Sequence, residues 1–144
     1  MINDSVWVGQ HFQAKEFRCP CCGLNEVHPK IVTILDRIRK DIGAPLRISS
    51  GVRCPTHNRS VGGASQSYHL PQDDGKGYAA DFTFAKGMMK IPINIARLYT
   101  MASDSADVGG AILYPTWVHI DVRGEMGKSR YRSTGKFPWP RIKS

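Results

Sequence analysis

Residues 49–82 read SSGVRCPTHNRSVGGASQSYHLPQDDGKGYAADF, and this stretch constrains the fold more than any other part of the chain. The alternating residues 46–50 just before it predict a strand that enters a turn at Gly51. Residues 78–84 again have the character of a strand. The residues between, from Gly51 to Gly77, are rich in Gly, Ser, Pro, Asn and Asp and predict a long loop. Loops of this length in a small domain usually carry function.

Helical periodicity appears on both sides of this stretch. Pro29 fits the first turn of a helix, and Gly43 and Pro45 end it. Within that helix the apolar positions recur with the helical period and form one face, made of Ile31, Ile34, Leu35 and Ile38. A second helix is predicted at about residues 92–103. Its inward side chains are expected to be Ile95, Leu98 and Tyr99.

Two more strands are predicted at residues 111–114 and 117–122. Residues 1–25 are expected to be irregular, with Phe12 and Phe17 anchoring them on the core, and the polar C-terminal tail is expected to wrap the surface. Helices and short antiparallel strands in mixed order predict an α+β fold, a small antiparallel sheet packed with a few helices.

The size and hydropathy of the chain indicate a soluble protein. Its 144 residues suit one compact domain, so we expect residues 1–144 to form a single domain and a monomer. No segment approaches the ~18–20 consecutive apolar residues of a membrane helix, so no membrane partner is expected. The N-terminus lacks the basic start and apolar run of a secretory signal. We therefore expect synthesis in the cytoplasm without a signal peptide.

The chain is strongly basic, with twenty Lys and Arg against twelve Asp and Glu and a net charge of +8. This charge favours a polyanionic partner such as a cell-wall polymer, although a solvated basic surface without a partner is equally consistent with it. We expect no nucleic-acid partner, because no nucleic-acid-binding motif accompanies the charge. The last fifth of the chain is rich in cationic side chains: Arg123, Lys128, Arg130, Arg132, Lys136, Arg141 and Lys143.

Four cysteines stand at Cys19, Cys21, Cys22 and Cys54. Reduced, partly buried thiols are one interpretation, and a disulfide is another. A structural zinc ion held by Cys19, Cys22, Cys54 and His28 or His57 is a third. The spacing lacks the paired C-x-x-C units of a zinc ribbon, so the sequence leaves these alternatives open.

Three potential metal ligands, His69, Asp81 and His119, stand in three different predicted elements. Two imidazoles and a carboxylate are a common protein ligand set of catalytic zinc, with the fourth position left for water. On a strand, His119 and Asp121 point to the same face. The spacing alone is weak evidence, because a histidine in an apolar strand is more often a hydrogen-bonded core residue.

Four ordered motifs strengthen this hypothesis. They are Ser50-Gly51-Val52-Arg53, Ser67-Tyr68-His69, Gly77-Tyr78-Ala79-Ala80-Asp81 and Trp117-Val118-His119. Together they resemble the zinc D-alanyl-D-alanine metallopeptidases, a family of peptidoglycan carboxypeptidases and phage endolysins that shares its fold with the hedgehog signalling domain. The resemblance covers roughly residues 10–123.

The resemblance implies a function for several residues. It makes His69, Asp81 and His119 the ligands of Zn²⁺ and makes Arg53 the residue that engages a substrate carbonyl or carboxylate. A guanidinium suits that task, because it offers a planar fork of donors, although a structural salt bridge would also explain Arg53. Ser67 is expected to support the loop that carries His69.

Two departures from the family pattern stand out. The segment between His69 and Asp81 is longer than usual, which predicts a five-residue insertion at residues 71–75 that bulges outward; Asp73 or Asp74 is an alternative carboxylate ligand. The usual acid before the second zinc histidine is replaced by Thr116, and a histidine that other members use is replaced by Tyr114. Asp121 is then the nearest candidate for the general base, or else it orients a ligand.

These observations predict a zinc-dependent peptidase that hydrolyses a bond in bacterial peptidoglycan stem peptides, as a D-Ala-D-Ala carboxypeptidase or an endolysin-type endopeptidase. Arg53 and Asp121 are its predicted catalytic residues. A basic domain without a signal peptide would suit a phage lysis enzyme that acts on the cell wall. The alternative is a non-catalytic cell-wall-binding module that retains the zinc fold, which the loss of an acid at Thr116 favours.

Overall fold

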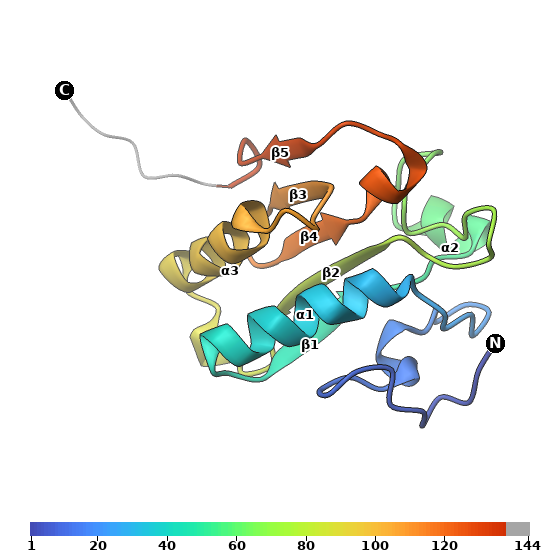
Figure 1. The fold of residues 1–144 in the computed structure, drawn as a ribbon, viewed down its shortest axis with the longest axis horizontal. Coiled ribbons are helices and arrows are strands. Elements are labelled where there is room, and N and C mark those ends of the chain that lie inside the picture. Colours follow the sequence, from blue (N-terminus) through green and yellow to red (C-terminus); the bar gives the residue numbers. More distant parts are fainter. Residues whose placement is uncertain (138–144) are drawn as a thin grey trace.

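The computed structural model describes residues 1–137, which form an α+β fold around one five-stranded sheet (Figure 1). The strand order is β1-β2-β4-β3-β5. The strands are β1 (Leu46–Ser50), β2 (Ala79–Phe84), β3 (Gly110–Leu113), β4 (Val118–Asp121) and β5 (Tyr131–Ser133). Arg141, Lys143 and the end of the predicted 1–144 domain lie outside the described residues.

The sheet is mixed rather than wholly antiparallel. The pairs β1–β2, β2–β4 and β3–β4 are antiparallel, as predicted, and β5 lies parallel to β3 at the edge. β5 was not predicted, because a polar three-residue edge strand has too short a pattern to separate it from a surface tail. The α+β class is confirmed, and the four predicted strands agree with β1 to β4 to within two residues at each end.

Three α-helices accompany the sheet: α1 (Pro29–Ile42), α2 (Pro55–Ser60) and α3 (Pro92–Asp104). The predictions for α1 and α3 are confirmed, and the expected apolar face of α1 is buried. Short 3₁₀ helices are η1 (Ala14–Phe17), η2 (Gly87–Met89) and η3 (Arg123–Met126). Within residues 1–137, no helix has the length and apolar character needed to cross a bilayer.

α2 lies inside the segment that the sequence predicts as loop. It has only six residues, too few for a helical period to appear. The sequence did contain one sign of a helix start, because Pro55 occupies the first turn. In the structure, Cys54 caps this helix by accepting a hydrogen bond from the backbone N–H of His57.

The two longer helices contact each other and cover one face of the sheet (Figure 1). Alternate residues of β2 and β4 join the apolar core beneath them, namely Ala80, Phe82, Phe84, Val118 and Ile120. Because strand side chains alternate, the intervening polar residues point to the opposite face; they are Asp81, Thr83, His119 and Asp121. The sheet therefore presents a polar face away from the helices.

The N-terminal segment packs against the start of the long loop. Phe12 and Phe17 are buried, which confirms their expected anchoring role. The backbone carbonyl of Phe17 accepts a hydrogen bond from Val52 N at 2.9 Å. A Cβ at Gly51 would lie 2.5 Å from that same carbonyl oxygen, so only glycine permits this close approach.

Candidate metal centre

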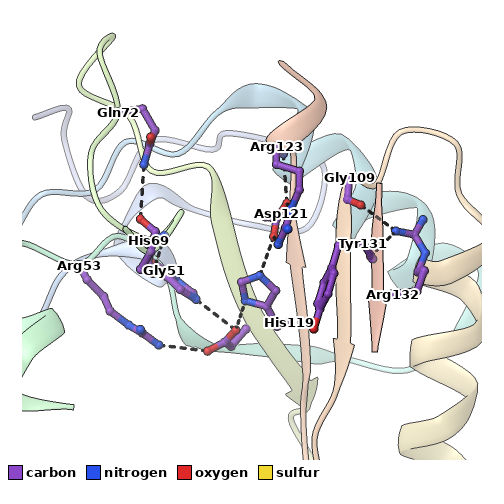
Figure 2. Close-up of polar contacts among 12 residues, drawn as sticks. Gly51, Arg53, His69, Gln72, Gly109, His119, Asp121, Arg123, Tyr131 and Arg132 are labelled. Atoms are coloured by element: carbon purple, nitrogen blue, oxygen red, sulfur yellow. Dashed lines mark hydrogen bonds and ion pairs between the residues drawn. The ribbon is translucent and has the colours of Figure 1, made fainter. Parts of the chain in front are cut away.

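His69, Asp81 and His119 meet on the polar face of the sheet. Figure 2 shows the rings of His69 and His119 on neighbouring sides of this cluster. Asp81 on β2 lies directly opposite His119 on β4 in the antiparallel register, and His69 approaches from the loop before β2. One potential ligand atom from each residue lies within 4.8 Å of the other two. All three side chains are buried. The structure thus brings the three residues of the predicted ligand set together.

His69 is held with one defined ring nitrogen facing Asp81. Its Nδ1 is 2.7 Å from the carbonyl oxygen of Gly51, which can only accept, so Nδ1 carries the proton. Its Nε2 then has the lone pair, 3.2 Å from Asp81 Oδ1. The hydroxyl of Ser67 accepts a hydrogen bond from His69 N at 3.1 Å, which agrees with the expected supporting role of Ser67.

His119 is oriented in the same way by a carboxylate. Its Nε2 is 2.9 Å from Asp121 Oδ2, and its Nδ1 is 3.0 Å from Asp81 Oδ1 (Figure 2). Asp121 has no exposed surface and also accepts two side-chain hydrogen bonds from Arg123, at 2.9 Å from Nε and 2.8 Å from Nη2. Arg123 therefore fixes Asp121, and Asp121 fixes the imidazole ring.

The charges of the cluster shift the pKa values of its members. Burial disfavours charged His119, but hydrogen bonds to Asp121 and Asp81 outweigh it and raise its pKa to about 9. Burial lowers the pKa of His69. Burial alone would raise the pKa of Asp81, but the charge of His69 and the hydrogen bond from His119 hold it well below its usual range. Asp81 is therefore an ionised carboxylate at neutral pH.

Arg53 reaches the cluster from the loop before α2. Its Nη2 lies 3.3 Å from Asp81 Oδ2, so it forms the salt bridge that one interpretation of the sequence proposes. Its Nε donates to Ser50 Oγ at 2.9 Å and its Nη1 to Asn58 Oδ1 at 3.3 Å. Asn58 is itself buried on α2. The short helix therefore helps to hold the guanidinium in place.

A cavity of about 430 Å³ opens over these residues. Arg53, His69, Asp81 and His119 line it, together with the aromatic side chains of Tyr68, Tyr114 and Trp117. Tyr114 and Trp117 stack with ring centroids 4.5 Å apart. Asp121 is not among the lining residues, because it lies behind His119. Of the described residues that line this cavity, Asp81 is the only acidic one.

The segment between His69 and Asp81 contains a small exposed turn. Pro71 pairs with Gly77, and Gln72 N donates to Lys76 O at 2.9 Å. Asp73 and Asp74 are exposed on this turn. The carboxylate of Asp74 accepts hydrogen bonds from Tyr78 Oη at 2.8 Å and Lys76 N at 3.0 Å. The turn closes on itself, so the longer segment still delivers Asp81 to β2.

Sequence reasoning missed several residues that build this site. Arg123 stands two residues beyond Asp121, but nothing in its neighbours indicated that it would fold back on that carboxylate. The carbonyl of Gly51 carries no side-chain signal at all. Asn58 lies in the helix that was not predicted. These contacts depend on how the loop packs. The sequence could have suggested only the contact between Arg123 and Asp121, because these two residues are close together in the chain.

The donor set fits a zinc ion. Two imidazole nitrogens and one ionised carboxylate converge in a buried site, and the other nitrogen of each imidazole donates its N–H to an oxygen atom, so that loss of one proton from His119 would leave both converging nitrogens able to bind a metal. A cavity lies on the open side.

Comparison with models of protein families gives a match over most of the chain. The family model described as Peptidase M15 matches residues 10–121, more than half of the chain. The matched range includes every residue of the candidate centre from Arg53 to Asp121. No curated protein matches the chain.

Proposed function

This chain belongs to the peptidase M15 family, and from that premise we propose that it is a zinc-dependent peptidase that hydrolyses a bond in bacterial peptidoglycan stem peptides. His69, Asp81 and His119 would hold the zinc ion. One observation carries the proposal: the Nε2 of His69 and the Nδ1 of His119 converge on the carboxylate of Asp81, beside a cavity. The proposed substrate is a peptide, and the protein is proposed to act as a monomer at the cell wall.

Zinc bound there would polarise the carbonyl under attack and make a water molecule acidic enough to act as the nucleophile near neutral pH. The remaining chemistry falls to the protein. Gly51 and Asp121 keep the two imidazoles in the tautomers that leave their lone pairs free. The ionised carboxylate of Asp81 offsets the positive charge of the metal.

Arg53 is proposed to bind a substrate oxygen. A guanidinium has five N–H donors, and three of them are directed at Ser50, Asn58 and Asp81. Among the described residues, this leaves two donors for a carbonyl or carboxylate oxygen in the cavity that Arg53 lines. The salt bridge and the substrate contact are therefore compatible, because the former positions the side chain for the latter.

Asp121 is proposed to orient His119 rather than to accept a proton from water. Its oxygen atoms already accept from His119 and Arg123, and it does not line the cavity. The hydrogen bond from Arg123 and the contact with His119 overcome the effect of burial and keep the pKa of Asp121 below its usual range. Such a carboxylate is a poor base.

Hydrolysis of isolated muropeptides, followed by mass spectrometry, tests the proposed activity. Zinc-loaded protein should cleave them, chelation should abolish cleavage, and added zinc should restore it. His69→Ala should lose both activity and bound metal. His11→Ala is the matched control, because His11 is an exposed histidine outside the cavity, and it should retain both. Intact muropeptides after treatment with fully zinc-loaded protein would contradict the proposal.

A non-catalytic wall-binding module is the second candidate. One observation favours it: among the described residues that line the cavity, Asp81 is the only one with a carboxylate, and Asp81 is a proposed zinc ligand. In that case zinc-loaded protein would bind isolated walls without releasing fragments. Retained wall binding in His69→Ala together with no turnover in the wild type would favour the module.

A further inference from the structure

All four cysteines of the chain gather beside the loop that carries Arg53, away from the cavity. The sulfur atoms of Cys19, Cys22 and Cys54 lie within 4.8 Å of one another. Cys21 is not part of that group of three, but its thiol is near enough to interact electrostatically with Cys54 and Cys19. Cys19 and Cys54 are buried, whereas Cys21 and Cys22 are exposed, and all four are free. The proposed peptidase activity uses none of them.

The local backbone brings Cys19 and Cys22 to the same side. Cys19 N donates to Leu24 O at 2.7 Å, and Gly23 N donates to Cys19 O at 2.9 Å. Gly23 has a φ of +81°, which closes this tight turn in a conformation that other residues rarely adopt. The turn contains a C-x-x-C spacing, one half of a typical structural zinc motif.

Two of these three sulfur atoms also accept a backbone N–H. Cys54 N donates to Cys19 Sγ and His57 N donates to Cys54 Sγ, both at 3.4 Å. A neutral thiol is a weak acceptor, whereas a thiolate is a strong one, so this arrangement suits sulfur atoms that carry negative charge.

From this geometry we propose a second metal site, in which Cys19, Cys22 and Cys54 hold a structural zinc ion and Cys21 supplies the fourth sulfur ligand. Close thiolates repel one another, and a divalent cation removes that repulsion. His28 is engaged elsewhere, because its Nδ1 accepts from Lys30 N and its ring packs on Tyr78. Four protein ligands leave no position for water, so this ion would be structural rather than catalytic.

The ion would join two segments that build the peptidase centre. Cys19 and Cys22 follow η1, and Cys54 directly follows Arg53. Between these points the backbone of Gly51 orients His69, and Arg53 lines the cavity. Fixing Cys54 against the N-terminal segment would therefore hold both the carbonyl of Gly51 and the guanidinium of Arg53 in place.

Cobalt(II) tests the site without relying on activity. Thiolate ligands give bound cobalt an intense sulfur-to-metal charge-transfer absorption, and the chain has no cysteine outside this cluster. Full-length protein, reduced and freed of metal, should bind about two cobalt ions per chain, one of them with that absorption. Saturation with cobalt without a charge-transfer band would overturn the proposal. So would disulfides among these cysteines in protein purified anaerobically with its metal.

Variants separate the two centres. Cys22→Ser alters an exposed side chain and should remove the charge-transfer band and one zinc ion per chain, while His69→Ala should keep the band and lose the other ion. Retention of both zinc ions by Cys22→Ser and by Cys54→Ser would overturn the proposal.

Cys21→Ser should weaken the band and speed zinc loss to a chelator, and an unchanged spectrum would reject Cys21 as the fourth ligand. Failure of the peptidase proposal would leave the thiolate band unaffected, so the two outcomes are distinguishable.

Discussion

Asp121 is buried behind His119 and accepts hydrogen bonds from Arg123, and this position supports the orienting role that we propose for it over the role of general base. Asp121→Asn would remove the charge that pairs with Arg123 and weaken the orientation of the imidazole. We expect zinc affinity or turnover to fall roughly 10–100-fold, as is typical when a residue that orients a metal ligand is replaced. Competition with a chromophoric chelator and hydrolysis of muropeptides measure both quantities.

Asp73→Asn is the control for that variant, because Asp73 is exposed on the turn between His69 and β2 and should be neutral. The orienting role would be refuted if Asp121→Asn kept its zinc affinity and lost turnover by more than about a thousandfold. A loss of that kind is expected when a proton acceptor is removed.

The two imidazoles of chelator-treated protein should titrate in opposite directions. His119 should have a pKa of about 9, and the pKa of His69 should lie below the ordinary value of 6.5. Because the folded-state pKa of His119 is raised, its contribution to stability is present below pH 6.5 and is lost as the pH rises through about 9. NMR of the histidine ring protons across this range measures both groups.

Zinc should remove the titration near pH 9, since a metal ion replaces the proton that His119 holds. The ring-proton signals of His11 should not move when zinc is added, because His11 is exposed and lies outside the cavity. Two histidines of the centre that titrated together near pH 6.5 would contradict the arrangement of carboxylates around His119.

At the scale of elements, β3 and β4 can support the centre only if a glycine stands at position 110. A Cβ there would lie 2.2 Å from Asp121 Oδ2 and 2.6 Å from Arg123 Nη2. Gly110→Ala should therefore displace the Asp121–Arg123 pair and destabilise the protein by about 1–3 kcal/mol through overpacking. Urea unfolding measures the change, and zinc affinity should fall with it.

Gly87→Ala is the matched control, because a Cβ at Gly87 meets no atom within 4 Å. Equal stabilities for Gly110→Ala and Gly87→Ala would show that the strand pair adjusts without strain, against this expectation.

The elements differ in how well the sequence predicted them, for physical reasons. α1 was predictable because a buried stripe on a helix repeats along its whole length, as the positions from Ile31 to Ile38 do. The alternation of β4 correctly indicated that His119 and Asp121 share a face. α2 and the turn at residues 71–77 are stabilised by caps and local hydrogen bonds, which leave no periodic pattern.

The candidate site divides in a similar way. The ligand set could be proposed from ordered motifs, because each motif keeps its own local geometry. Its supports could not. The carbonyl of Gly51 meets His69 only because two segments pack together, and Arg123, although two residues from Asp121, folds back on it without any local pattern that indicates this contact. The four cysteines were visible in the sequence, but only the fold brings Cys54 to the turn that holds Cys19 and Cys22.

At the scale of the whole molecule, the net charge of +8 should act on an intact cell wall but not on a small soluble substrate. An anionic polymer attracts many cationic side chains at once, including the exposed Arg59, Lys128 and Arg130, and salt screens this attraction. We therefore expect binding to isolated walls to weaken markedly when salt is raised from about 0.05 M to about 0.5 M, as the Debye length shortens from roughly 14 Å to 4 Å. Sedimentation of protein with purified walls measures the bound fraction.

Hydrolysis of a soluble muropeptide over the same salt range is the control, and its kcat/KM should change little, because Arg53 is partly shielded from solvent and contacts its ligands directly. Replacing Lys128 and Arg130 together by Gln should reduce wall binding at low salt while leaving muropeptide hydrolysis unchanged, since neither residue is among those that line the cavity. If wall binding responded neither to salt nor to these substitutions, the cavity alone would bind the wall. The basic surface would then contact solvent and have no part in wall binding.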